Sequence, residues 1–195
     1  MKTNIILAGV GGQGILSIAA VIGYTAIKRD LYIKQAEVHG MSQRGGAVQS
    51  TLRISDKELY SDLIPEGKAD LIISVEPMEG LRYLPWLKED GWLITNSKPF
   101  VNIPDYPDMD SLVEAIRSVP NHILIDAAAL ASKIKSARSS NMVVLGAAIP
   151  FLPFDWEDYV FGINQLFGNK GEEVVNKNLE ALKTGEEYSG NQNKI

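Results

Sequence analysis

The sequence contains no cysteine, and this absence excludes a whole set of chemistries from the chain. Without thiols a protein cannot form disulfides, attack a substrate through sulfur, or hold zinc or an iron–sulfur cluster through thiolates. The only histidines are His39 and His122, which are too few for a histidine-rich metal centre. Any redox chemistry that involves this protein must therefore come from a bound cofactor or from another subunit.

The sequence also lacks long apolar runs and an excess of basic residues. No stretch reaches the ~20 apolar residues that a membrane-spanning helix needs. The residues Met1 to Thr3 lead directly into the first apolar run, which leaves no room for a signal peptide. We therefore expect a cytoplasmic protein without a membrane anchor. The net charge of −5 argues against nucleic acid as the main partner.

The chain does have a glycine-rich motif close to its beginning. The apolar run 4–8 is long enough for one buried strand, and an apolar segment of helical length continues to Lys28. Between them lies GVGGQG at residues 9–14, which satisfies GxGxxG in the strand–turn–helix setting that gives the motif its meaning. Glycine permits the tight turn and the close approach of a phosphate, and the helix N-terminus favours an anion. The candidate binding residues are Gly9, Gly11, Gly12, Gln13 and Gly14.

A simpler interpretation is that these glycines only let the first helix pack tightly on the sheet. The fingerprint does not require Gly12, so a fourth glycine in six residues favours a ligand that approaches the backbone.

The order of the remaining segments predicts the fold. Strands are expected at 31–36, 47–54, 58–64, 69–75, 91–96 and 122–126, and helices at 78–87, 111–118, 127–136, 141–152, 155–167 and 171–183. Alternating strands and helices predict an α/β, Rossmann-like three-layer sandwich, with a mostly parallel sheet and helices on both faces. We expect a single domain over residues 1–185 and a flexible tail over 186–195. The apolar segment 141–152 predicts a helix buried between layers or at a subunit interface.

A second glycine-containing segment, residues 37–46, has no helical or strand periodicity and is interpreted as an ordered loop. Ligands of parallel sheets bind at the carboxyl ends of the strands, so residues 9–14, 37–46 and 76–78 are expected to share one rim. Arg44 beside two glycines is suited to clamp an anion. The candidate residues in this loop are Glu37, His39, Gln43, Arg44, Gly45 and Gly46.

Three functions remain open at this level. The GxGxxG motif is compatible with an NAD(P)-dependent dehydrogenase, but Glu37 opens a long loop instead of ending a simple strand, which argues against a ribose-binding acid. An adenylating enzyme of the ubiquitin-activating type has a similar glycine loop but often a CxxC zinc site, which is absent. The third is an assembly scaffold without catalytic function. No nucleophile–base pair, metal-ligand set or carboxylate pair can be assigned.

Three segments together resemble one known family. They are AGVGGQG at residues 8–14, EVHGMSQRGG at 37–46 and NMVVLGA at 141–147. In these segments the chain is similar to the gamma-type component of 2-oxoacid:ferredoxin oxidoreductases, and within that group to the indolepyruvate branch. The second segment is much more specific than the first, and the resemblance extends over most of the chain.

The resemblance implies a division of labour between subunits. In that family the gamma-type component has a Rossmann-like fold and no cofactor chemistry of its own. It would work with a partner subunit that carries thiamine diphosphate and [4Fe-4S] clusters, with coenzyme A as acyl acceptor and ferredoxin as electron acceptor. Loops 9–14 and 37–46 would face the partner's active site and the coenzyme A path. No catalytic residue follows from the family motifs, so we expect the chain alone to be inactive; a homodimer in isolation is left open.

Overall fold

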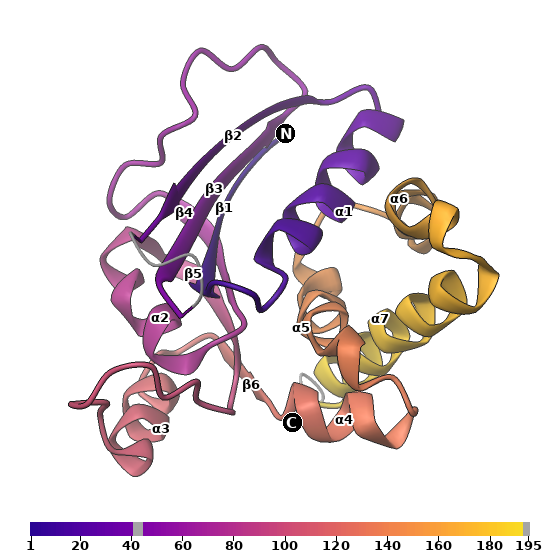
Figure 1. Cartoon of the computed structure of the whole chain (residues 1–195). Coiled ribbons are helices and arrows are strands. Elements are labelled where there is room, and N and C mark those ends of the chain that lie inside the picture. The colour runs from indigo at the N-terminus through magenta and orange to yellow at the C-terminus, as the bar shows by residue number, and fades with distance from the viewer. Residues whose placement is uncertain (41–44, 193–195) are drawn as a thin grey trace.

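The computed structural model describes residues 1–40 and 45–192, which form one six-stranded sheet flanked by helices (Figure 1). The strand order is β2-β3-β1-β4-β5-β6. Strand β3 is antiparallel to both of its neighbours, whereas β1, β4, β5 and β6 pair in parallel. The predicted mostly parallel sheet is therefore confirmed. The strands are β1 Lys2–Val10, β2 Tyr32–His39, β3 Ala47–Ser55, β4 Ala69–Ser74, β5 Leu87–Asn96 and β6 His122–Ile125.

Helices cover both faces of the sheet, as the predicted three-layer arrangement requires (Figure 1). One face is covered by α2 and α3, and the other by α1 and the C-terminal helices. Among the described residues no helix is both long and apolar enough to cross a membrane. The helices are α1 Ile15–Lys28, α2 Pro77–Arg82, α3 Met109–Arg117, α4 Ala127–Lys133, α5 Ser140–Ala148, α6 Trp156–Phe167 and α7 Glu172–Gln192.

Alternation along β1 divides the apolar residues between two cores. Ile5 and Leu7 belong to the larger core, on the side of α1, whereas Ile6 belongs to the smaller core on the opposite side. All three side chains are fully buried. Because successive side chains of a strand point to opposite faces, a central strand with both faces covered is apolar at every position. This explains why the run 4–8 could be identified from the sequence.

The apolar segment expected to be a buried helix is α5, which lies between the sheet and α7. Its residues Met142 to Ala148 are all buried within the chain itself. A β-carbon at Gly146 would overlap the carbonyl oxygen of Leu182, and one at Gly185 would overlap that of Val143. The two helix backbones therefore touch, and the apolar surface of α5 is covered by the chain's own core instead of lying open for a subunit interface.

Several expected boundaries are wrong. Strand β5 begins at Leu87 instead of 91, and α2 ends at Arg82 instead of 87. Strand β2 continues to His39, so residues 37–39 are not loop. Residues 58–64 form no strand, although the hydroxyl of Thr51 donates to the carbonyl of Asp62 and anchors them beside β3. The predicted tail is wrong over 186–192, because α7 continues to Gln192 and the hydroxyl of Tyr188 donates to the carbonyl of Leu124 at 2.9 Å. Residues 193–195 lie outside the described part of the chain.

The contact between α5 and α7 predicts a specific sensitivity. Gly185→Ala should lower the free energy of unfolding by about 1–3 kcal/mol, because the added methyl group forces two packed backbones apart. Gly190→Ala is the matched control on the same helix, since a β-carbon there meets no atom of the described residues within 4 Å. Urea denaturation of both variants measures the difference. Equal stability of the two would show that the helices do not pack this closely.

Candidate functional site

The glycine loop at the carboxyl end of β1 contains two glycines that are required by packing. A β-carbon at Gly9 would overlap the side chain of Val75 at the end of β4. A β-carbon at Gly14 would lie 2.5 Å from Nδ2 of Asn141 on α5. That amide group instead donates a hydrogen bond of 3.1 Å to the carbonyl of Gly14. For these two positions the simpler interpretation of the motif, close packing of the first helix, is sufficient.

Gly12 differs from both, because its position is open. It is exposed, has a φ of +97°, and a β-carbon there would meet no atom of the described residues within 4 Å. The loop is braced by Gln13, whose side-chain oxygen accepts a hydrogen bond of 2.8 Å from the N–H of Val10. Glycine at position 12 is therefore required by the backbone conformation of the loop and not by close packing. The outer side of the loop is accessible there.

The first turn of α1 presents unused backbone donors beside Gly12. Gly14 occupies the N-cap position with a φ of +82°, and no described side chain caps the helix. Within residues 1–40 and 45–192, the N–H groups of Gly12, Gly14 and Ile15 donate no hydrogen bond. Exposed N–H groups at a helix N-terminus, together with the helix dipole, favour an anion.

The described residues of the second glycine segment include the end of β2, and they lie beside the start of the antiparallel strand β3. Glu37 pairs with Ser50 and His39 with Val48 across β2 and β3. One Glu37 oxygen accepts a hydrogen bond of 2.6 Å from Gln35, and the other lies 3.3 Å from Nε2 of His39. Glu37 is thus engaged along the edge strand, while His39 lies beside the glycine loop.

The two glycine segments are joined directly through their backbones. The N–H of Gly11 donates a hydrogen bond of 2.9 Å to the carbonyl of Gly46, and Nδ2 of Asn102 donates one of 2.6 Å to the carbonyl of Gly45. The loops after β1 and β2 therefore lie on one rim, as predicted. The candidates Gln43 and Arg44 lie outside the described residues.

Three hollows meet at Gly12. The first has a volume of about 340 Å³ and lies between the glycine loop, Leu16 and His39. The second, of about 310 Å³, lies at the carboxyl ends of β1, β4 and β5 and includes Asn96. The third, of about 460 Å³, lies between the start of α1 and the C-terminal helices. The second hollow is at the point where the chain order of the strands changes direction, which is where open α/β sheets bind ligands.

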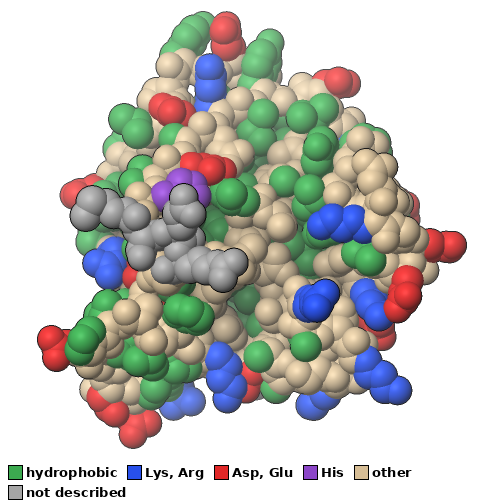
Figure 2. Space-filling view, in the orientation of Figure 1, with side chains coloured by type: hydrophobic (Ala, Val, Ile, Leu, Met, Phe, Trp, Pro, Cys, Tyr) green, Lys and Arg blue, Asp and Glu red, His purple; other side chains and the backbone are tan. Residues whose placement is uncertain are grey.

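Three cationic residues at these hollows were missed by sequence reasoning. Arg138 lines both the second and the third hollow, and Lys170 and Lys177 line the third. Figure 2 shows Lys and Arg side chains on this face over the C-terminal helices. Lys177 is partly neutralised by Glu173, with the two groups 2.5 Å apart, whereas Arg138 and Lys170 have no carboxylate within 4.0 Å among the described residues. The surroundings of Gly12 thus combine backbone donors with positive charge and suit a ligand that carries several phosphates.

A buried carboxylate holds one wall of the rim in place. Glu76 follows β4, is fully buried, and accepts hydrogen bonds from the N–H of Glu79 at 2.9 Å and of Phe100 at 3.3 Å. It also accepts one from the hydroxyl of Tyr106. Burial and this hydrogen bond to a carboxylate raise the pKa of Tyr106, so its hydroxyl remains a donor at neutral pH. Among the described residues no group of three or more acidic or histidine side chains is placed to bind a metal ion.

The comparisons with known proteins agree with this architecture. A model of the pyruvate ferredoxin/flavodoxin oxidoreductase family matches residues 4–188. The chain belongs to this family. It is 36% identical over 194 residues to the indolepyruvate oxidoreductase subunit IorB of Archaeoglobus fulgidus, covering 95% of this chain and 94% of the relative. It is 25% identical over 141 residues to the pyruvate/ketoisovalerate oxidoreductases common subunit gamma of Thermococcus kodakarensis, covering 71% and 72%.

Solved structures share the fold at low sequence identity. The pyruvate oxidoreductase subunit PORC of Thermotoga maritima superposes with a TM-score of 0.71 at 22% identity, covering 95% of this chain and 96% of that one. A chain of the 2-oxoglutarate:ferredoxin oxidoreductase of Magnetococcus marinus superposes with a TM-score of 0.76 at 24% identity. The match covers 97% of this chain but only 31% of that longer one, so the fold recurs there as part of a larger polypeptide. The resemblance seen in the three sequence segments is confirmed.

The role of Glu76 can be tested by stability. Glu76→Ala should lower the free energy of unfolding by about 2–3 kcal/mol, because it leaves buried donors without an acceptor. It should also speed proteolytic cleavage within residues 97–108, which contain Phe100 and Tyr106. Glu89→Ala, at an exposed glutamate of β5, is the matched control. If both variants unfold at the same urea concentration and are cleaved at the same rate, Glu76 does not anchor this wall.

Proposed function

We propose that this chain is the subunit without iron–sulfur clusters of an indolepyruvate-type 2-oxoacid:ferredoxin oxidoreductase, and that its rim binds the phosphates of coenzyme A. Such a complex decarboxylates a 2-oxoacid oxidatively to an acyl-CoA. The observation that carries the proposal is the convergence of unused N–H groups and cationic side chains at Gly12. Family membership supplies the reaction class, and the names of the relatives favour indolepyruvate as the substrate.

The partner subunit is proposed to hold thiamine diphosphate and [4Fe-4S] clusters, because this chain has no cysteine to ligate a cluster. Thiamine diphosphate supplies the electron sink for the carbanion, and the clusters pass electrons to ferredoxin. The task left to this chain is to bind and orient the acyl acceptor. Coenzyme A carries a diphosphate and a separate 3′-phosphate. The start of α1 is suited to one of these groups, and Arg138 with Lys170 to the other.

A stand-alone NAD(P)-dependent dehydrogenase is the second candidate, and the position of Glu37 counts against it. In a dinucleotide fold an acid at the end of the second strand binds the ribose hydroxyls. Here the second strand pairs with antiparallel β3, and Glu37 accepts a hydrogen bond from Gln35 along the edge strand. The rim therefore retains the phosphate-binding part of a dinucleotide site without its ribose-binding acid.

The proposal is tested with the assembled complex of this chain and its partner. Reduction of ferredoxin or a viologen dye by indolepyruvate should require both chains and coenzyme A, with no turnover by this chain alone. Arg138→Gln should raise the KM for coenzyme A by about 10-fold, the size expected for losing one hydrogen bond to a charged group, and leave the KM for the 2-oxoacid unchanged. Arg117→Gln, at an exposed arginine of α3, is the matched control.

Three results would contradict the proposal. Turnover by this chain alone with NAD(P) would establish the dehydrogenase instead. Full activity of the partner without this chain would remove the subunit assignment. An unchanged KM for coenzyme A in Arg138→Gln would show that the rim does not bind its phosphates.

A further inference from the structure

A second cationic hollow lies at the amino ends of the parallel strands, at the end of the sheet opposite to the glycine rim. It has a volume of about 460 Å³ and lies where β1, β4 and β5 begin, beside the segment that leads from β3 to β4. The nine residues of β1 span eight intervals of about 3.3 Å, which places its two ends roughly 26 Å apart, so this hollow and the rim are separate. Its charged lining residues are Lys2, Arg53, Lys68, Asp70 and Lys88.

Arg53 is the central residue of this hollow. The residue is only 8% exposed, yet no carboxylate among the described residues lies within 4.0 Å of its guanidinium group. Its Nε donates to the side chain of Asn4 at 3.0 Å, and its Nη1 donates to the carbonyls of Ser61 and Leu63 at 2.8 and 3.0 Å. The Nη2 group donates no hydrogen bond within the described chain. A buried charge without a counter-ion is costly, so this arrangement is unusual for a purely structural arginine.

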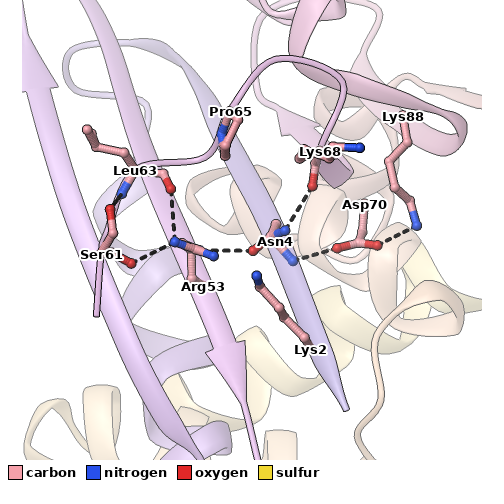
Figure 3. A pocket seen from close by; sticks show the side chains of 9 residues that line it. All are labelled: Lys2, Asn4, Arg53, Ser61, Leu63, Pro65, Lys68, Asp70 and Lys88. Atoms are coloured by element: carbon pink, nitrogen blue, oxygen red, sulfur yellow. Dashed lines mark hydrogen bonds and ion pairs between the residues drawn. The ribbon is translucent and has the colours of Figure 1, made fainter. Parts of the chain in front are cut away.

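The single carboxylate of the hollow is already engaged. Asp70 accepts a hydrogen bond of 2.7 Å from the N–H of Asn4 and forms an ion pair of 2.6 Å with Lys88. Figure 3 shows this pair to one side of Asn4 and Arg53 to the other, with the Lys2 side chain pointing toward them. Neither Lys2 nor Lys68 has a carboxylate within 4.0 Å among the described residues. Three cations therefore line the hollow without an anionic partner.

We propose that this hollow is an anion site for a phosphate group, either free or in a small phosphate ester. The free Nη2 group of Arg53 can donate to phosphate oxygens, because Nε and Nη1 are already engaged, and Lys2 and Lys68 supply the remaining charge. The volume exceeds that of one phosphate and leaves room for an attached group. The bound anion would neutralise the charge of Arg53. Because Arg53 also donates hydrogen bonds to the carbonyls of Ser61 and Leu63, the anion would help to hold the segment that leads from β3 to β4 in place.

The test follows individual amide resonances of the 15N-labelled full chain during titration with inorganic phosphate, pyrophosphate or AMP. The signals of Asn4, Arg53 and Asp70 report this hollow, whereas those of Gly12 and Gly14 report the rim. At least one probe should shift the first group saturably. The relative affinities of phosphate and AMP then separate a site for the free anion from one for an ester.

Variants decide whether the shifts come from this hollow. The double variant Lys2→Gln, Lys68→Gln removes two cations whose side chains make no hydrogen bond or ion pair among the described residues, so the fold should be kept. The variant should weaken anion binding, measured at Asn4 and Arg53, by about 10-fold or more. Lys183→Gln, at an exposed lysine of α7, should leave it unchanged. Absence of saturable shifts at Asn4 and Arg53, or the same affinity in all three proteins, would overturn the proposal whatever happens at the rim.

Discussion

The backbone hydrogen bond from Gly11 to the carbonyl of Gly46 connects the two parts of the chain on which the rim depends. It joins the turn after β1 to the residue that precedes β3, although the two are more than 30 positions apart in the sequence. Such a bond requires the two backbones to approach without intervening side chains, which glycine on both sides permits. With the two turns fixed, Gly12 is left at the outer side of the loop, where three hollows meet.

The helical layer supplies the cationic side chains of the rim. The turns provide backbone donors but no described positive charge, whereas Arg138 and Lys170 come from the segments that flank α5 and α6. These segments are held in position because α5 packs directly on α7 through Gly146 and Gly185. A contact deep in the helical layer therefore determines where the cations at the rim lie.

The elements that could be predicted from the sequence are those in which local pattern and final environment agree. Within the run 4–8, residues 5–8 are all apolar because β1 is central, and α5 is apolar on all sides because the sheet and α7 enclose it. The prediction of a loop at Glu37 to His39 was wrong because the edge strand β2 is exposed and polar. Only its pairing with β3 shows that these residues form a strand. The prediction of a tail from residue 186 was wrong for a similar reason. The end of α7 is polar, and the contact of Tyr188 with β6 holds it in place. Arg138 and Lys170 carry no local signal, because only the tertiary fold brings them to Gly12.

Hydrogen exchange of the assembled complex, with and without coenzyme A, tests the central claim most directly. The amides of Gly12 and Gly14 make no hydrogen bond within the described chain, so they should exchange rapidly in the unliganded complex. Coenzyme A should slow exchange in peptides that contain residues 9–16 and leave those covering 49–55 unchanged. Unaltered exchange over 9–16, under conditions in which coenzyme A supports turnover, would contradict the assignment of the glycine rim as its phosphate-binding surface.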